Sequence, residues 1–114
     1  MGTYSKKLQE VKELLQKLKN EVPKEIKGFN NFFASVEAEG VLNLKQKHLI
    51  NVALAVAAQC EWCISLHVKE ALNSGATKKE IIEAGMQAVL MHGGPALMYM
   101  IPLEKAIEEF SNED

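Results

Sequence analysis

The chain has 114 residues, enough for one domain whose core needs no disulfide or metal to hold it together. Hydrophobic residues make up 47% and charged residues 25%, a globular composition that excludes a fibrous or largely disordered chain. The formal net charge is -2, and all 13 basic residues are lysine. Nucleic-acid binders usually carry a basic excess, and arginine is the usual grip on phosphate, so we expect no nucleic-acid partner.

No stretch of the sequence predicts a membrane span or a targeting signal. The longest apolar run, residues 52–58, is far too short to cross a bilayer. Residues 1–20 are lysine-rich and amphipathic, without the apolar core of a signal peptide. We therefore expect a cytoplasmic protein with no membrane partner. In that reducing compartment a pair of cysteines is more often catalytic or metal-binding than structural.

Helical periodicity begins near the start of the chain. The first predicted helix ends near Pro23 and carries one apolar stripe, made of Leu8, Val11, Leu15, Leu18 and Val22. This stripe can be an internal packing face or a subunit contact, and because it resembles a coiled-coil seam we favour a subunit contact. Pro23 ends this helix or opens the next, which covers residues 24–39 and stops at Gly40.

The second part of the chain reads as four further helices. Asn43 can cap a helix over residues 44–58, whose stretch 52–58 is apolar all round and should be buried. We expect a break at residues 58–60, because one helix from 44 to 73 would be longer than most. The remaining helices are expected at residues 60–73, at 78–91 behind a capping box, and at about 95–110, where Pro102 should kink or interrupt the chain.

No run alternates with period two, so the sequence predicts an all-α fold of about six helices. The one compositional boundary lies near Gly40, since the chain before it is charged and amphipathic and the chain after it is rich in alanine. We therefore predict a single domain over residues 1–114. Its N-terminal helices occupy residues 1–40, and a core at residues 41–110 carries the chemical motif.

That motif contains both cysteines of the chain. Cys60, Cys63 and His67 are spaced by three and four residues, which brings them to one face of a helix. A thiol titrates near pH ~8.5 and reacts as its thiolate. An imidazole one turn away can accept the proton, and a place in the first helical turn adds the helix dipole. Two cysteines at this spacing can also close a disulfide, so that one attacks and the other resolves.

The stretch from Leu44 to about Met100 resembles the carboxymuconolactone decarboxylase and alkylhydroperoxidase D-like family. The matching segments are LKQKHLI at residues 44–50, AAQCEWCISLH at 57–67, ALNSGATKKEI at 71–81 and GGPA at 93–96. The resemblance implies a helical bundle that assembles as a symmetric oligomer, a homotrimer or homohexamer. It implies no metal and no organic cofactor.

The same resemblance assigns roles to the motif. Cys63 would be the activated thiol, Cys60 its disulfide partner and His67 the base. The substrate would be a peroxide or a disulfide, and the electrons would come from a dithiol protein or a small thiol. The family pattern places a glutamate in the preceding helix, where this chain has His48. We treat His48 as a fourth catalytic candidate, in a proton relay or in a buried polar contact.

Three functions stay open from the sequence. The first is a thiol–disulfide oxidoreductase with antioxidant, peroxiredoxin-like peroxidase activity. The second is a decarboxylase acting on a carboxymuconolactone-type substrate, in which the cysteine pair has no obvious role and for which the missing arginines fit poorly. The third is a non-catalytic oligomeric or zinc-binding module with Cys60, Cys63, His67 and His48 as ligands, although three ligands on one short stretch would strain tetrahedral geometry.

Overall fold

The computed structural model describes residues 2–112, and seven helices fall within that range. They are α1 (Thr3–Glu21), α2 (Pro23–Glu37), α3 (Leu44–Ala57), α4 (Glu61–Asn73), α5 (Lys78–His92), α6 (Gly94–Met98) and α7 (Met100–Ser111). Residues 2–112 contain no strand, so the predicted all-α fold is confirmed. None of the described helices is both long and apolar enough to cross a membrane.

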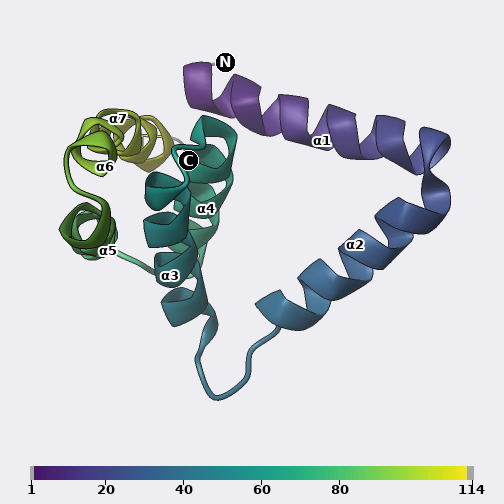
Figure 1. Ribbon diagram of the computed structural model, residues 1–114, viewed down its shortest axis with the longest axis horizontal. Helices are drawn as coiled ribbons and strands as arrows, with labels where there is room; N and C mark the ends of the chain where they lie inside the picture. Colours follow the sequence, from purple (N-terminus) through teal and green to yellow (C-terminus); the bar gives the residue numbers. More distant parts are fainter. Residues whose placement is uncertain (1, 113–114) are drawn as a thin grey trace.

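Figure 1 shows a bundle on one side and a projecting arm on the other. In the bundle, α3 packs against both α4 and α5, and α7 packs against α4. The arm consists of α1 and α2, which meet at Pro23 as the first residue of α2 and form a V. One end of α1 rests on α4, whereas α2 has no buried residue.

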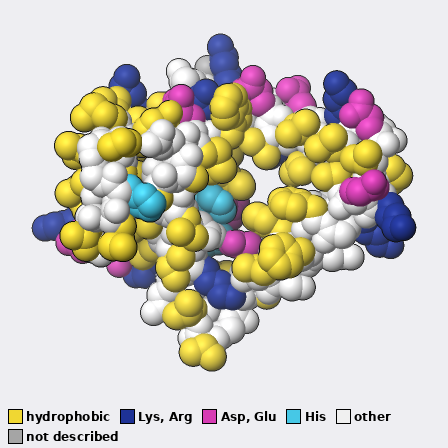
Figure 2. All heavy atoms as spheres, viewed as in Figure 1, with side chains coloured by type: hydrophobic (Ala, Val, Ile, Leu, Met, Phe, Trp, Pro, Cys, Tyr) yellow, Lys and Arg dark blue, Asp and Glu magenta, His cyan; other side chains and the backbone are white. Residues whose placement is uncertain are grey.

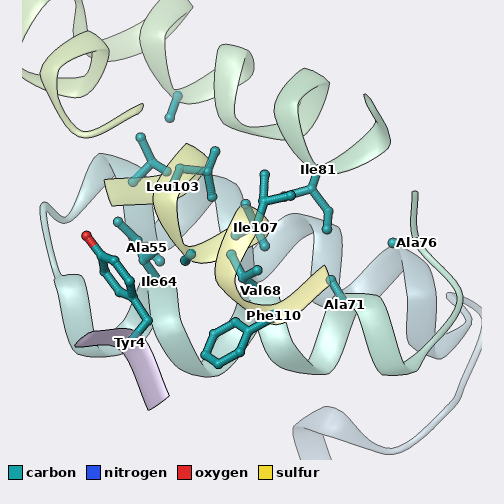
Figure 3. Packing of buried hydrophobic residues seen from close by; sticks show 14 of the residues in the cluster. Tyr4, Ala55, Ile64, Val68, Ala71, Ala76, Ile81, Leu103, Ile107 and Phe110 are labelled. Atoms are coloured by element: carbon teal, nitrogen blue, oxygen red, sulfur yellow. The ribbon is translucent and has the colours of Figure 1, made fainter. Parts of the chain in front are cut away.

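The core lies where α3, α4, α5 and α7 meet (Figure 3). Its largest fully buried apolar side chains are Ile64, Ile81, Leu103, Ile107, Val52, Val56 and Val68. The prediction that residues 52–58 are buried all round is wrong for Leu54, which is 61% exposed, and for Ala58. Only one side of α3 is covered by the other helices, so the opposite side of the same apolar run faces outward.

The apolar stripe of α1 faces the rest of the chain. Leu8, Val11 and Leu15 line a pocket of about 300 Å³ together with Phe29 and Phe33 of α2 and with Leu66 of α4. Leu8 also packs against the core. The stripe is therefore half-buried within the chain, and its role as a subunit contact stays a prediction.

The break between α3 and α4 occurs where the sequence predicts it. The backbone N–H of Gln59 donates to the carbonyl of Val56 (3.1 Å), and that of Cys60 donates to the carbonyl of Ala55 (3.2 Å). These two bonds make a Schellman cap on α3. The cap requires a left-handed residue, and Gln59 supplies it with φ 57°. Cys60, the next residue, is already the N-cap of α4.

Gln59→Gly is expected to raise the free energy of unfolding by about 1 kcal/mol, because a side chain in the left-handed region is strained and glycine is not. Urea unfolding of the oxidised protein measures the change. Ala58→Gly is the matched control. Ala58 has right-handed helical angles (φ -78°, ψ -7°), so glycine there relieves no strain and only adds conformational freedom to the unfolded chain. A destabilised Gln59→Gly protein would contradict the strain argument.

The last predicted helix is interrupted, but three residues before Pro102. The chain breaks at Tyr99, and Pro102 becomes the third residue of α7. A proline lacks the backbone N–H and clashes with the carbonyl four residues earlier, so a continuous helix through Pro102 is disfavoured. In the first turn of α7 the missing N–H costs nothing, because no partner inside the helix awaits it.

Glu109 of α7 ties the two ends of the described chain together. Its carboxylate accepts hydrogen bonds from the backbone N–H groups of Tyr4 (3.1 Å) and Ser5 (2.7 Å), at the N-terminus of α1. Gly2 at the N-cap has no side chain to do this. Burial acts to raise the pKa of Glu109, but the hydrogen bonds from Ser5 and Tyr4 together outweigh it and lower the pKa. The start of α1 is thereby fixed on the bundle.

Candidate functional site

Both cysteines lie in the first turn of α4. Cys60 is the N-cap and Cys63 is the third helical residue, with their Cα atoms 5.2 Å apart and their sulfurs joined in a disulfide. The backbone N–H of Cys63 donates to the sulfur of Cys60 (3.1 Å). The free N–H groups and the positive end of the helix dipole favour a negative charge at this position. A thiolate formed here on reduction is therefore stabilised.

His67 lies one turn further along α4 and shares a pocket with Cys63. The pocket has a volume of about 250 Å³, and its other lining residues are Asn51, Leu54 and Ala55 of α3 and Ala58, the C-cap of that helix. Burial lowers the pKa of His67 below its ordinary value, and the nearby charge of Glu37, which acts to raise the pKa, does not compensate. This shift favours the neutral imidazole at pH 7, the form that can accept a proton.

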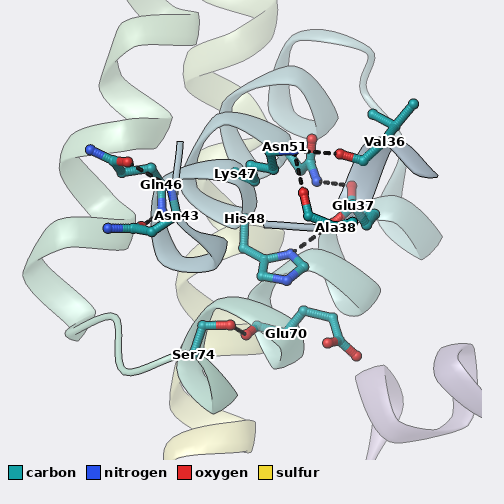
Figure 4. Close-up of polar contacts among 10 residues, drawn as sticks. All are labelled: Val36, Glu37, Ala38, Asn43, Gln46, Lys47, His48, Asn51, Glu70 and Ser74. Carbon is teal, nitrogen blue, oxygen red and sulfur yellow. Dashed lines mark hydrogen bonds and ion pairs between the residues drawn. The ribbon is translucent and has the colours of Figure 1, made fainter. Parts of the chain in front are cut away.

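His48 lies on α3, buried beside His67. The centroids of the two imidazole rings are 6.4 Å apart. Nδ1 of His48 lies 3.3 Å from the Oε2 oxygen of Glu37 (Figure 4). The structure thus brings together all four residues singled out from the sequence: Cys60 and Cys63 in a disulfide, Cys63 and His67 in one pocket, and His48 against His67.

The sequence analysis missed Glu37, the last residue of α2. Its Oε1 oxygen accepts a hydrogen bond from the side-chain amide of Asn51 (2.7 Å). The end of α2 is held in place by Lys47, whose ammonium group donates to the carbonyl oxygens of Val36 (2.8 Å) and Ala38 (Figure 4). A cation at a helix C-terminus is favourable. No spacing rule could find Glu37, because its contacts span the loop between α2 and α3.

Trp62 occupies the place between the two cysteines and packs against α1. Its indole N–H donates to Glu10 (3.0 Å), and the ammonium group of Lys7 lies 4.4 Å from the centroid of the Trp62 rings. A cation over an aromatic face is attractive. The cysteine motif is therefore in contact with α1 through Trp62 and with α3 through the packing of α4.

A metal centre would need its ligands to converge. No group of three or more His, Cys, Asp or Glu side chains between residues 2 and 112 is arranged to hold a metal ion. Of the four ligands in the zinc hypothesis, the two sulfurs are bonded to each other, and Nδ1 of His48 is directed at Glu37.

Comparison with known sequences gives a family and several relatives. The model of the carboxymuconolactone decarboxylase family matches residues 23–105. Uncharacterized protein 4 in the cox locus of Paracoccus denitrificans is 48% identical over 61 residues, which cover 54% of this chain and 55% of the relative. The match thus spans just over half of that relative's length. An uncharacterized protein of Haemophilus influenzae is 31% identical over 101 residues, covering 89% of this chain and 87% of the relative.

Two solved structures share the fold over nearly the whole chain. A carboxymuconolactone decarboxylase family protein from Legionella pneumophila has a TM-score of 0.91 and 38% identity, with 96% of this chain and 97% of that chain covered. A protein of the same family from Thermotoga maritima, for which a role in an antioxidative response has been suggested, has a TM-score of 0.83 and 25% identity. That match covers 92% of this chain and 90% of that chain.

Proposed function

This chain belongs to the carboxymuconolactone decarboxylase family, and from that premise we propose that it is a thiol–disulfide oxidoreductase with peroxidase activity. The observation that supports the proposal most directly is the disulfide between Cys60 and Cys63 next to a pocket that Cys63 shares with His67. The role suggested for the similar Thermotoga maritima protein in an antioxidative response agrees with it.

The first step starts from the reduced protein. His67, in its neutral form, takes the proton of the Cys63 thiol, and the thiolate attacks the terminal oxygen of the peroxide. The O–O bond breaks as the S–O bond forms. The departing oxygen takes the proton from the His67 imidazolium and leaves as an alcohol or as water. Cys63 is left as a sulfenic acid, oxidised by two electrons.

The second step closes the disulfide. The Cys60 sulfur attacks the Cys63 sulfenic sulfur, and the hydroxyl group takes the Cys60 proton and leaves as water. The distance of 5.2 Å between the Cα atoms suits a disulfide, so the backbone needs no rearrangement. Two thiols and one peroxide have then become one disulfide, one alcohol or water, and one water.

The third step restores the thiols with a dithiol donor. One donor thiolate attacks the Cys63 sulfur on the pocket side, and Cys60 leaves as a thiolate. Cys60 is the better leaving group, because the N–H of Cys63 and the α4 dipole stabilise its charge. The second donor thiol then displaces Cys63 and the donor departs as a disulfide. A disulfide substrate is reduced by the reverse route.

Reduction by a dithiol donor requires a reducing compartment, and we therefore propose that the protein works in the cytoplasm.

A single-turnover experiment tests this function. The protein is reduced with dithiothreitol, freed of it, and mixed with one equivalent of hydrogen peroxide or cumene hydroperoxide. We expect one peroxide consumed and two thiols lost per chain, with the Cys60–Cys63 disulfide identified by mass spectrometry. Protein alkylated beforehand with iodoacetamide is the control. Thiols that survive the peroxide, together with no exchange with a disulfide substrate, would exclude the redox function.

The decarboxylase alternative rests on the family name. Its substrate carries carboxylates, and a pocket for it would present cationic side chains. Among the described residues, the lining of the pocket at Cys63 consists of Asn51, Leu54, Ala55, Ala58, Cys63 and His67, with no lysine. This pocket therefore favours the redox function.

We also propose that the chain assembles with copies of itself as a homotrimer or homohexamer. The support comes from α2, whose 15 residues include no buried side chain. Four of its large apolar residues are exposed, namely Phe29, Phe32, Phe33 and Val36. Figure 2 shows hydrophobic side chains gathered on the arm. Helices of this length depend on packing for their stability, and large exposed apolar patches mark association surfaces. A second copy of the chain would cover this face.

Phe32→Asp is expected to reduce the particle from a trimer or hexamer towards a monomer. Phe32 is the most exposed of the α2 aromatic residues at 67%, and a carboxylate in an apolar interface is costly. Multi-angle light scattering measures the mass. Asn31→Asp places the same charge on the neighbouring exposed residue and is expected to leave the mass unchanged. A monomeric wild-type protein would contradict the assembly.

A further inference from the structure

We infer that Glu37 is a positioning residue of the redox site: its carboxylate, brought in by the end of α2, balances the positive charge that the His67–His48 pair carries when Cys63 is ionised. The inference rests on the proposed function for its purpose, although the charge pairing can be measured separately. It also answers the departure found in the sequence, where His48 replaces the acidic residue of the family pattern.

The first support is that one oxygen of the Glu37 carboxylate is buried although the residue as a whole is not. The Glu37 side chain is 18% exposed, and that of His48 is 9% exposed. The two facing atoms, Glu37 Oε2 and His48 Nδ1, are both buried and have no hydrogen-bond partner elsewhere. A buried carboxylate is costly unless a positive charge or donor faces it. At 3.3 Å from Oε2, Nδ1 of the His48 imidazole is the atom that faces the carboxylate.

The second support is that Glu37 is held in place from α3. Asn51 fixes the other carboxylate oxygen at 2.7 Å, and Lys47 holds the last carbonyls of α2. The side chains that hold the last turn of α2 come from within two turns of α3. They are those of Lys47, His48 and Asn51. Elsewhere α2 has no buried residue, so these polar contacts are what fix its last turn beside the histidines.

The third support is that a positive charge on His67, next to His48, needs a negative charge nearby. Two imidazoles with centroids 6.4 Å apart repel each other when both carry charge. When His67 takes the proton of Cys63, His48 disfavours the new positive charge on His67. The Glu37 carboxylate, which lies next to His48, favours that charge. The effect of Glu37 on His67 has this direction, since the Glu37 charge acts to raise the pKa of His67 while burial and His48 act to lower it. Glu37 thus acts through the imidazoles and does not touch the sulfur.

The first test is a titration of the histidine ring signals by NMR in the oxidised protein. Glu37→Gln keeps the shape and removes the charge, and we expect the pKa of His67 to fall, because the charge that acts to raise it is lost. Glu39→Gln is the matched control, because it removes an exposed carboxylate two residues away, and the titration should stay that of the wild type. This readout needs no activity and would not move if Glu37 only docked α2.

The second test is the rate of Cys63 alkylation by iodoacetamide in the reduced protein, in a Cys60→Ser background. Glu37→Gln should slow the reaction about tenfold at pH 7 and leave the plateau at high pH unchanged, since the free thiolate is then formed without help. Glu37→Asp should recover part of the rate. Should Glu37→Gln disturb the fold by circular dichroism, Glu37→Asp compared with Glu37→Asn, equal in shape and different in charge, decides instead.

The outcomes separate the charge pairing of Glu37 from the proposed redox function. A wild-type His67 titration and a wild-type alkylation profile in Glu37→Gln would overturn the inference while leaving the redox function intact. A lowered pKa of His67 in a protein that reduces neither peroxide nor disulfide would support the charge pairing and reject the function.

Discussion

Cys63→Ser is expected to abolish peroxide reduction, with a loss on the order of a thousandfold or more, because a serine hydroxyl cannot replace the thiolate nucleophile. Cys63 is the sulfur that shares the pocket with His67. The loss should occur in the first turnover, measured by rapid mixing of the reduced protein with peroxide. Circular dichroism checks that the variant keeps its fold.

Cys60→Ser is the matched comparison, since it removes the other sulfur of the same disulfide. We expect its first turnover to survive and its steady-state activity to be lost, because the Cys63 sulfenic acid has no partner with which to form a disulfide. A dimedone adduct on Cys63 would trap that intermediate. The reverse pattern, with a first turnover lost only in Cys60→Ser, would make the N-capping cysteine the nucleophile.

Leu103→Ala is expected to lower the free energy of unfolding by about 2–5 kcal/mol, the usual cost of a cavity at a fully buried leucine. Leu103 has no exposed surface. Its side chain lies close against α5, since a Cβ atom on Gly85 would stand 2.7 Å from Leu103 Cδ2. In so close a fit, neighbouring side chains have little freedom to move into the cavity that the substitution leaves.

The measurement is denaturant unfolding at one fixed protein concentration, so that any assembly contributes equally to each variant. Ile101→Ala is the control, because Ile101 is on the same helix and 55% exposed. We expect it to cost less than about 1 kcal/mol. Similar losses in the two variants would contradict the assignment of Leu103 to the core.

Much of the fold could be predicted because its signals are local. Thr77 makes the capping box that its spacing to Glu80 indicates, and Asn43 caps α3 as predicted, with a box to Gln46 that the sequence analysis did not single out. The break before Cys60 was equally predictable, since an uninterrupted helix would have been too long. These signals involve residues within four positions of each other, so the sequence carries them directly.

The features that sequence reasoning missed depend on how helices are arranged. Glu37 reaches His48 only because the loop after α2 turns that helix towards α3, and no periodicity encodes this direction. The exposure of Leu54 has the same origin, since an apolar run does not reveal which of its sides another helix covers. The interruption near Pro102 was predicted, but its position at Tyr99 depends on where the next helix could start.

The position of Trp62 has a practical consequence. It is the only tryptophan in the chain and stands within two residues of each sulfur, held by Glu10 and Lys7. Disulfides quench indole emission and thiols do so less, so the intrinsic fluorescence of the unlabelled protein reports the oxidation state of its cysteine pair. Each half of the proposed redox cycle would then have an optical signal of its own, and candidate peroxides and donors could be ranked by how fast each changes it.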